Sequence, residues 1–307
     1  MSKAIEDKLS KIPVINLLVK LGKKLVLPGF EGLSVYDLIE IYVIGIIKGT
    51  FSARASSISW SFFLSLFPFL LFLLNLIPYV PIDNFENNFF EFINGALPKQ
   101  TSGFFSGIFN DIASNPRGGL LSTVFILSIL FMTNGINAVF SGFEYSYHVN
   151  LNRNFVRQYL VALGVSIIVA SLLLVTVIGT LYFTYLVNNL NEIGMVDDTL
   201  FWLTIGQYAL FVFMIFIIVA TLFYFGTSEG RNNKFFSPGA FMTTFLIIIT
   251  TYLFGIYIDN FSNYNKLYGS IGAVLILMLY IWLNANLLLL GFELNASLNQ
   301  LRKNFDK

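Results

Sequence analysis

The sequence predicts an all-α membrane protein with six transmembrane helices, and with amphipathic interfacial helices at the N-terminus and in the first outer loop. The first observation is composition: of the 307 residues, 56% are hydrophobic and 11% are charged, whereas a soluble domain carries about 25% charged residues. So few charged side chains do not cover a water-exposed globule, and lipid is the solvent that this composition indicates. The second observation is that apolar residues come in runs long enough to cross a bilayer, which takes about 20 residues.

Residues 1–52 are predicted to form a cytoplasmic and interfacial amphipathic region. Lysines interrupt the apolar residues here and no small-residue cleavage site follows, so we expect no cleavable signal peptide. Ile12, Ile15 and Val19 recur at helical spacing beside the lysines, which is typical of a helix on an anionic membrane surface. A solvated basic tail explains the same residues, and both interpretations remain open. A second amphipathic segment, residues 34–48, is expected to lie along the interface.

A transmembrane domain is predicted over residues 53–296, followed by a cytoplasmic tail over residues 297–307. Its six spans are predicted at residues 55–79, 118–143, 158–190, 199–226, 235–258 and 268–292. Pro68 is expected to kink the first span, because proline removes a backbone hydrogen bond and clashes with the preceding turn. The third span is longer than a bilayer requires, so it is expected to tilt or project. The hydrophilic loop at residues 82–117 carries Phe-rich segments at helical spacing, which predict two short helices on the outer membrane surface.

The distribution of lysine and arginine predicts the orientation. These bases gather in residues 1–54, in the loops after the second and fourth spans, and in the tail, whereas the opposite side carries only Lys99, Arg117 and Lys266. The loop between the third and fourth spans carries acidic residues and no base. Because loops rich in Lys and Arg stay in the cytoplasm, both termini are expected to be cytoplasmic in a multi-pass plasma-membrane protein.

The sequence contains few residues of the kinds that catalysis requires. A nuclease needs clustered carboxylates that hold a metal, or general acid and base groups. This chain has no cysteine, a single histidine at His148, and carboxylates scattered at the ends of the spans. No phosphate loop, nucleophile elbow or metal motif is present. We therefore expect no enzyme activity, no cofactor and no bound metal, and the net charge of +1 argues against a nucleic-acid partner.

Three parts of the chain resemble one family. They are residues 53–55 (ARA) with 59–78 (SWSFFLSLFPFLLFLLNLIP), residues 237–240 (SPGA), and residues 260–265 (NFSNYN), 268–273 (YGSIGA) and 291–296 (GFELNA). These segments resemble the YihY/BrkB family of bacterial inner-membrane proteins, formerly labelled ribonuclease BN. The resemblance implies a six-helix protein of the bacterial inner membrane and supplies no activity. Transport has been suggested for the family, and some members have been tied to serum resistance or envelope lipid traits.

Polar side chains recur within the apolar spans at helical spacing, and ionisable or amide groups at membrane depth are costly enough to need an explanation. In the first span they follow each other by three or four residues, which keeps them on one side of a helix. Arg54 stands at the cytoplasmic end, where it either snorkels to the interface or pairs with Glu144 or Glu293. If these residues line a solute path, Arg54 is expected to attract an anionic group. The candidate polar path consists of Arg54, Ser57, Ser61, Ser65, Asn134, Asn137, Glu144, Asn286 and Glu293. Hydrogen bonds that only fix helix packing explain the same pattern, and both interpretations stay open.

A further polar cluster precedes the sixth span on the outer side. Its members are Asp259, Asn260, Asn263 and Asn265. They form either a polar turn that caps the sixth helix or an outer mouth that binds a solute or a lipid headgroup.

The function that these features favour is transport or export of a small or amphipathic solute related to the cell envelope. The alternative, from a different class, is a non-transporting membrane scaffold for envelope assembly, and ribonuclease activity has the least support. The expected partners are membrane lipids and a small-molecule or lipid substrate, and the residues do not indicate an oligomeric state. A transporter needs a continuous polar path, whereas a scaffold tolerates a dry, packed core.

Overall fold

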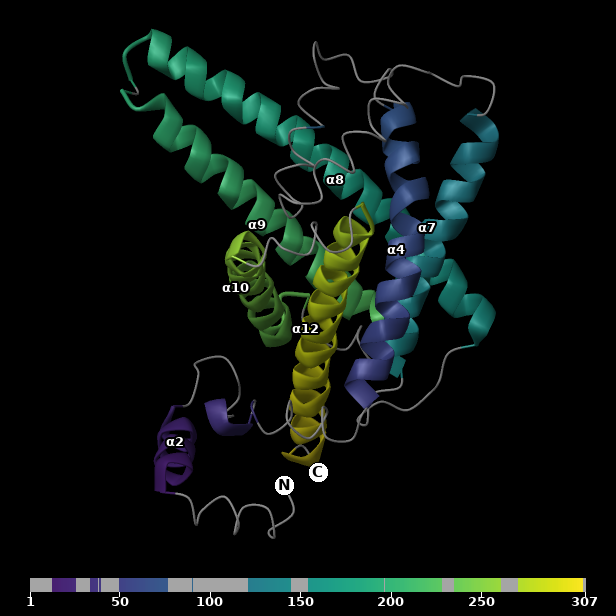
Figure 1. The fold of residues 1–307 in the computed structure, drawn as a ribbon, viewed down its shortest axis with the longest axis vertical. Helices are drawn as coiled ribbons and strands as arrows, with labels where there is room; N and C mark the ends of the chain where they lie inside the picture. The colour runs from purple at the N-terminus through teal and green to yellow at the C-terminus, as the bar shows by residue number, and fades with distance from the viewer. Residues whose placement is uncertain are drawn as a thin grey trace.

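A computed structural model of the chain is built from long helices (Figure 1). It describes residues 13–25, 34–37, 39, 50–76, 90, 121–144, 154–195, 197–227, 235–260 and 270–305. The helices in these ranges are α2 (Pro13–Lys24), α4 (Thr50–Leu76), α7 (Leu121–Glu144), α8 (Phe155–Glu192), α9 (Thr199–Gly226), α10 (Pro238–Asn260) and α12 (Ser270–Phe305). Within the described residues, 5 helices, namely α7, α8, α9, α10 and α12, are long and apolar enough to cross a bilayer. The predicted class, a helical membrane protein with several spans, is therefore confirmed.

Local sequence signals set the ends of the long helices. Asn154 precedes α8, and its side-chain oxygen accepts a hydrogen bond from the backbone N–H two residues on. Asp198 caps α9 in the same way through the N–H three residues on, at 3.0 Å. Gly194, in the turn between α8 and α9, has a positive φ of 73°, which glycine adopts without strain. α10 opens with Pro238, whose fixed φ suits a first helical turn.

Two helices run beyond the predicted spans. α8 has 38 residues, which is about 57 Å at 1.5 Å per residue, and Figure 1 shows it leaning out with α9 as a long hairpin away from the other helices. α12 has 36 residues and ends at Phe305, so it continues into the segment predicted as a tail. No glycine or proline follows Gly291 in this helix, and its sequence therefore holds no stop signal at residue 292.

Three helices, α4, α7 and α10, pack against α12. α4 packs against α7 and α12, α10 packs against α12 and α9, and α8 packs against α7 and α9 (Figure 1). Aromatic rings fill the junction of α7, α9 and α12. Phe143 stacks on Phe292 with ring centroids 4.2 Å apart and meets Phe223 edge-on at 5.6 Å. This part of the bundle is therefore a dense apolar core.

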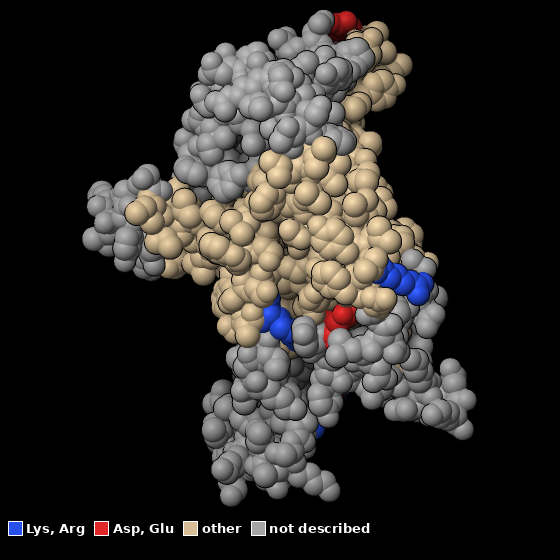
Figure 2. Space-filling view, turned by 90° about the vertical axis from the view of Figure 1, so that its right-hand side faces the viewer, with Lys and Arg blue, Asp and Glu red and all other residues tan. Residues whose placement is uncertain are grey.

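Charged side chains border the apolar part of the molecule. On one face, a broad band has no charged residue, Lys and Arg lie along its lower border together with an acidic group, and a further acidic group marks the upper end (Figure 2). The turn between α8 and α9 carries the exposed residues Glu192, Asp197 and Asp198. Arg54 and Arg157 lie close to the starts of α4 and α8. The base at the start of α8 and the acids that follow its end lie at opposite ends of this helix, which agrees with the charge pattern of the loops.

Part of the N-terminal region is described. α2 ends with Lys23 and Lys24, and a helical turn follows Ser34. The backbone N–H and the hydroxyl of Ser34 both donate to the Asp37 carboxylate, at 2.8 and 2.7 Å, so the two residues cap this turn. The two outer helices predicted within residues 82–117 lie outside the described residues, apart from the position of Phe90.

Candidate functional site

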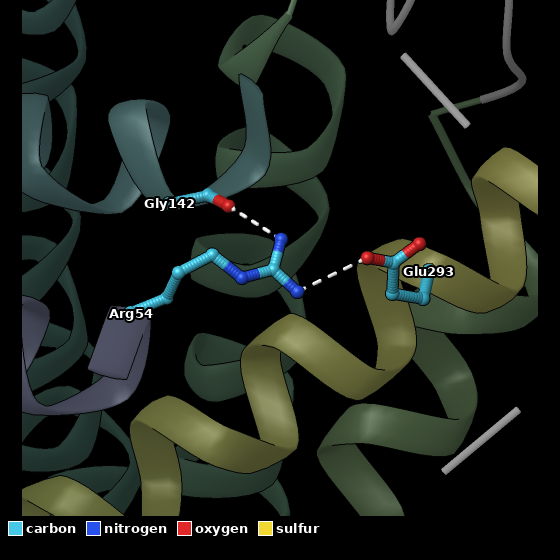
Figure 3. Close-up of polar contacts among 3 residues, drawn as sticks. All are labelled: Arg54, Gly142 and Glu293. Carbon is cyan, nitrogen blue, oxygen red and sulfur yellow. Dashed lines mark hydrogen bonds and ion pairs between the residues drawn. The ribbon is translucent and has the colours of Figure 1, made fainter. Parts of the chain in front are cut away.

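The candidate site is an ion pair buried where α4, α7 and α12 meet (Figure 3). The Arg54 guanidinium on α4 donates through Nη2 to Glu293 Oε1 on α12 at 3.1 Å. Through Nη1 it donates to the carbonyl oxygen of Gly142 on α7 at 3.0 Å. The side chains of Arg54 and Glu293 are 9% and 5% exposed. Of the two acidic residues considered as partners of Arg54, Glu293 is therefore the one that forms the ion pair.

The Arg54 side chain also lies over an aromatic ring, and one of its N–H donors makes no hydrogen bond. Its guanidinium carbon lies 4.8 Å from the centroid of the Phe51 ring, a distance at which the ring face attracts a cation. The Nε atom is shielded and makes no hydrogen bond within the described part of the chain. A buried donor without a partner costs about 1–3 kcal/mol. Arg54 is thus firmly placed while part of its hydrogen-bonding capacity stays unused.

A close contact between α10 and α12 positions the turn that carries Glu293. Asn295 reaches the start of α10, where its Oδ1 accepts from the Gly239 N–H at 2.9 Å and its Nδ2 donates to Ser237 Oγ at 2.9 Å. Asn295 thereby caps α10 from a different helix, because the first N–H groups of a helix lack partners within it. A Cβ on Gly239 would overlap the Gly291 carbonyl oxygen. Only glycine lets the two backbones approach this closely.

Three of the segments that carry the family resemblance thus meet at one end of the bundle. The ARA segment supplies the arginine, the SPGA segment supplies the start of α10, and the GFELNA segment supplies the glutamate and the asparagine that caps α10. The residues in this connected set are Arg54, Ser237, Gly239, Gly291, Glu293 and Asn295. Arg54 and Glu293 were predicted as members of the candidate path, whereas the contact between the SPGA and GFELNA segments was not predicted.

Contacts between α4 and α7 hold the arginine's helix in place. Ser65 Oγ donates to the Phe62 carbonyl oxygen of its own helix at 2.8 Å, and a Cβ on Gly135 would lie 2.7 Å from that hydroxyl oxygen. α4 continues through Pro68 as one helix, and the Ser128 hydroxyl of α7 donates to the Pro68 carbonyl oxygen. Ser65 therefore lies at a tight contact between two helices. This is what we expect if the polar residues of the first span only fix helix packing.

A second polar cluster ties α7 to α8. With its amide nitrogen toward Glu144, Gln158 donates to both carboxylate oxygens at 2.9 and 3.1 Å, and it accepts from the Ser141 hydroxyl at 3.1 Å. The side chain of Asn137 lies 3.0 Å from the same amide. Asn137 and Glu144 were predicted as members of the candidate path, whereas Gln158 was not. The sequence did hold a signal for Gln158, because an amide at the start of the third apolar run needs a hydrogen-bond partner.

The remaining residues of the candidate path lie apart from these clusters. Ser57 and Asn134 are exposed, and Ser61 is half-buried. The Asn286 amide donates to the Trp282 carbonyl oxygen of its own helix at 2.7 Å. A path that joins all of these groups stays a prediction.

The candidate outer mouth is described only at its beginning. Asp259 and Asn260 end α10, whereas Asn263, Asn265 and also His148 lie outside the described residues. In the part of the chain that the structure describes, no group of three His, Cys, Asp or Glu residues is placed to hold a metal ion.

Apolar helices of spanning length, with a charged pair buried between two helices, define a multi-pass helical membrane protein. The chain belongs to the Virulence factor BrkB family, whose model matches residues 46–307. The family resemblance that the sequence motifs indicate is therefore confirmed.

Individual relatives agree with this assignment. YfkH of Bacillus subtilis (strain 168), a protein named as ribonuclease-like, is 28% identical over 253 residues, which is 82% of this chain and 91% of that protein. UPF0761 membrane proteins of Xanthomonas axonopodis pv. citri and Xanthomonas campestris pv. campestris are each 38% identical over 65 residues, which is 21% of this chain. The match spans 15% of the length of these Xanthomonas proteins. No solved structure matches the chain.

Proposed function

We propose that the chain crosses a bacterial inner membrane six times, with α4 as the first span and both termini in the cytoplasm. α4 has 27 residues, about 40 Å at 1.5 Å per residue, and no charged residue follows Arg54 within it. It packs against α7 and α12, which are themselves candidate spans. An even number of spans puts both termini on the same side, and the distribution of bases makes that side the cytoplasm.

Single cysteines in this cysteine-free chain test the topology. A membrane-impermeant maleimide is expected to label Asn110→Cys in intact cells and to label Asn304→Cys only after the membrane is permeabilised. The parent chain without cysteine is the control for background labelling. The opposite pattern, with Asn304→Cys labelled and Asn110→Cys protected in intact cells, would contradict the proposed orientation.

We further propose that the protein transports or exports a small or amphipathic, envelope-related solute that carries an anionic group. The buried pair of Arg54 and Glu293 is the observation that carries this proposal. Charged side chains inside transmembrane segments are rare and mark substrate or ion pathways. A guanidinium is the side chain best suited to carboxylate and phosphate groups, because its N–H groups match them in pairs. The meeting point of α4, α7 and α12 at one end of the bundle is a suitable place for a gate.

Transport is expected to depend on Arg54 and Ser61. In proteoliposomes that release a fluorescent short-chain phosphatidylglycerol, Arg54→Ala is expected to abolish release and Arg54→Lys to keep part of it, because lysine retains the charge but not the paired N–H groups. Ser61→Leu is expected to abolish release by filling the candidate path. Ser56→Leu, at an exposed position of the same helix, is the matched control and is expected to transport normally.

Every variant in this assay is first shown to insert and to remain folded. Full release by both Arg54→Ala and Ser61→Leu would show that the candidate-path residues of α4 only fix helix packing.

A membrane scaffold is the second candidate function, and the apolar core favours it. Phe140 and Phe143 are fully buried, and the ring of Phe292 stacks on Phe143. A dry core of this kind is what a scaffold tolerates and what a transporter has to open. Retained cellular function in Ser61→Leu, together with the absence of phosphatidylglycerol release by the unaltered protein, would favour the scaffold.

We also propose that the protein has no ribonuclease activity of its own. Among the described residues, no group of three His, Cys, Asp or Glu side chains is placed to hold a metal ion, and hydrolysis of RNA needs a held metal or a matched acid and base. Purified protein is expected to leave RNA intact in the presence of Mg²⁺ or Mn²⁺. Cleavage that is lost in Glu144→Gln would overturn this part of the proposal.

A further inference from the structure

Asn134 lies near the middle of α7 and is exposed. It belongs to the apolar stretch Ile126–Glu144, and at 1.5 Å per residue it stands about 12 Å from the start of this stretch and about 15 Å from its end. The hydrocarbon core of a bilayer is about 30 Å thick, so Asn134 lies close to its centre. Lipid chains at that depth offer an amide no hydrogen-bond partner.

Other asparagines in the apolar helices bond to their own helix. The amides of Asn284 and Asn286 donate to the carbonyl oxygens of Tyr280 and Trp282, at 2.8 and 2.7 Å. Among the described residues, the Asn134 side chain makes no hydrogen bond of this or any other kind. An amide in hydrocarbon without a partner is unfavourable, so we expect a group from another molecule to satisfy Asn134.

Asn134 stands at the centre of an apolar helix face. Leu127, Leu130 and Phe131 precede it at spacings of seven, four and three, and each of them is exposed. Ser141 follows at the next spacing of seven and is half-buried. These spacings keep side chains on one side of a helix. We call this side of α7 the Asn134 face.

Neighbouring helices contact other sides of α7. Gly135 packs against the Ser65 side chain of α4, and the Thr133 hydroxyl lies 3.4 Å from the Ser166 hydroxyl of α8. Figure 1 shows the upper part of α7 at the right-hand edge of the bundle, with α4 on its other side. The Asn134 face is therefore directed away from the helices that pack on α7.

The geometry of a membrane makes a second copy of this chain the fitting partner. All copies insert in one orientation, so a two-fold axis that relates two of them runs along the membrane normal and their α7 helices are parallel. In such a pair, a residue at the centre of the contact meets the same residue of the other copy. The Asn134 amide is complementary in charge to itself, because its partially positive N–H groups match its partially negative oxygen.

We propose that two copies of this chain associate through the Asn134 face of α7, with the two Asn134 side chains hydrogen-bonded to each other near the centre of the bilayer. Asparagine at a core position of parallel helices fixes their register and their number, and polar side chains hold membrane helices together through interhelical hydrogen bonds. Leu127 and Leu130 pack against their counterparts in the turns before Asn134.

This inference goes beyond the proposed transport function and does not depend on it. It requires only that α7 lies in a bilayer. In the dimer, Asn134 belongs to an interface between copies and not to the candidate polar path.

Gln207 of α9 is a second exposed amide without a hydrogen bond among the described residues. A Cβ on Gly226, at the end of α9, would lie 2.5 Å from the Phe143 ring of α7, so these two residues mark one level of the bundle. From that level Asn134 is about 14 Å along α7, whereas Gln207 is about 29 Å along α9. Gln207 therefore lies closer to the far surface of a layer about 30 Å thick, where water satisfies an amide.

Energy transfer between labelled copies measures the association. Full-length protein with Asn304→Cys is labelled with donor or acceptor dye and placed in vesicles of phosphatidylethanolamine and phosphatidylglycerol. Varying the ratio of protein to lipid gives the dissociation constant of the dimer. Asn134→Leu is expected to raise this constant about tenfold, the effect of one or two interhelical hydrogen bonds.

Two further variants separate the amide from the shape of the face. Asn134→Gln is expected to keep most of the association, because glutamine carries the same donor and acceptor groups. Gln207→Leu removes the exposed amide of α9 and is the matched control, which is expected to associate like the unaltered protein.

Cross-linking tests the parallel contact in a chain that keeps Asn134. Leu127→Cys, in this cysteine-free chain, is expected to form a disulfide-linked dimer on mild oxidation in the membrane, because equivalent residues of a parallel pair come within disulfide range. Leu253→Cys, at an exposed position of α10, is the control and is expected to stay monomeric. Adding Asn134→Leu to Leu127→Cys is expected to lower the yield of dimer.

Several outcomes would overturn the proposal. They are an unchanged dissociation constant in Asn134→Leu, a chain that stays monomeric at every ratio of protein to lipid, and a weaker association in Gln207→Leu but not in Asn134→Leu. Loss of phosphatidylglycerol release in Asn134→Leu with unchanged association would also overturn it, and would return Asn134 to the candidate path. The cross-link at Leu127→Cys stands as a test even where a variant at Asn134 folds poorly.

Discussion

Arg54→Ala is expected to lower the free energy of unfolding by about 3–5 kcal/mol, because it leaves one partner of a buried ion pair without its counterion. The substitution removes the group that pairs with Glu293 at 3.1 Å and that donates to the Gly142 carbonyl oxygen. It also removes the cation that lies over the Phe51 ring. Three helices lose a shared contact in one step, since Arg54, Gly142 and Glu293 come from α4, α7 and α12.

Unfolding in mixed detergent micelles, followed by circular dichroism, measures this effect. The double variant Arg54→Leu with Glu293→Leu is the matched control, because replacing a whole buried pair by apolar residues is often neutral or stabilising. We expect it to recover most of the lost stability. Equal loss in the single and double variants would show that packing, rather than the unpaired charge, is responsible.

Gly239→Ala is expected to destabilise the protein by about 1–3 kcal/mol, the range for forcing extra atoms into a packed contact. The added Cβ would overlap the Gly291 carbonyl oxygen and lie 2.6 Å from the Asn295 side chain. Because the nearest obstacle is backbone, relief requires α10 and α12 to separate. That movement breaks the hydrogen bond by which Asn295 caps α10, and it shifts the turn that carries Glu293.

Gly255→Ala provides a control on the same helix. A Cβ at Gly255 meets nothing within 4 Å, and alanine is preferred over glycine inside a helix by about 1 kcal/mol. Gly255→Ala is therefore expected to leave stability unchanged or to raise it in the same micelle assay. Similar stability of the two variants would contradict the close contact at Gly239.

The helices themselves were predictable because their signals are local. The span predicted at residues 199–226 coincides with α9, where Asp198 supplies a cap and the apolar run ends at Gly226. α10 begins at Pro238, inside the predicted range. A helix without a stop signal was predicted less well, since α12 continues to Phe305. Apolar runs and caps depend on residues only a few positions apart, so a sequence shows them directly.

The polar residues were predictable as a set but not in their pairing. Asn137 and Glu144 share a side of one helix, and the structure supplies their partner Gln158 from another helix. Asn286 shows the opposite case, because its amide bonds to its own helix at the Trp282 carbonyl oxygen. Spacing along one helix tells which residues share a face, and it carries no information about what lies opposite that face.

The sequence by itself determined the class of protein and the family, and it left three possibilities open for Arg54, namely snorkelling, Glu144 and Glu293. Only the tertiary structure decided for Glu293. It also decided that Asn295 caps α10 through Gly239, 56 residues away. The physical reason is that a helix's own sequence sets its length and its apolar face, whereas its rotation and depth follow from how all its neighbours pack together.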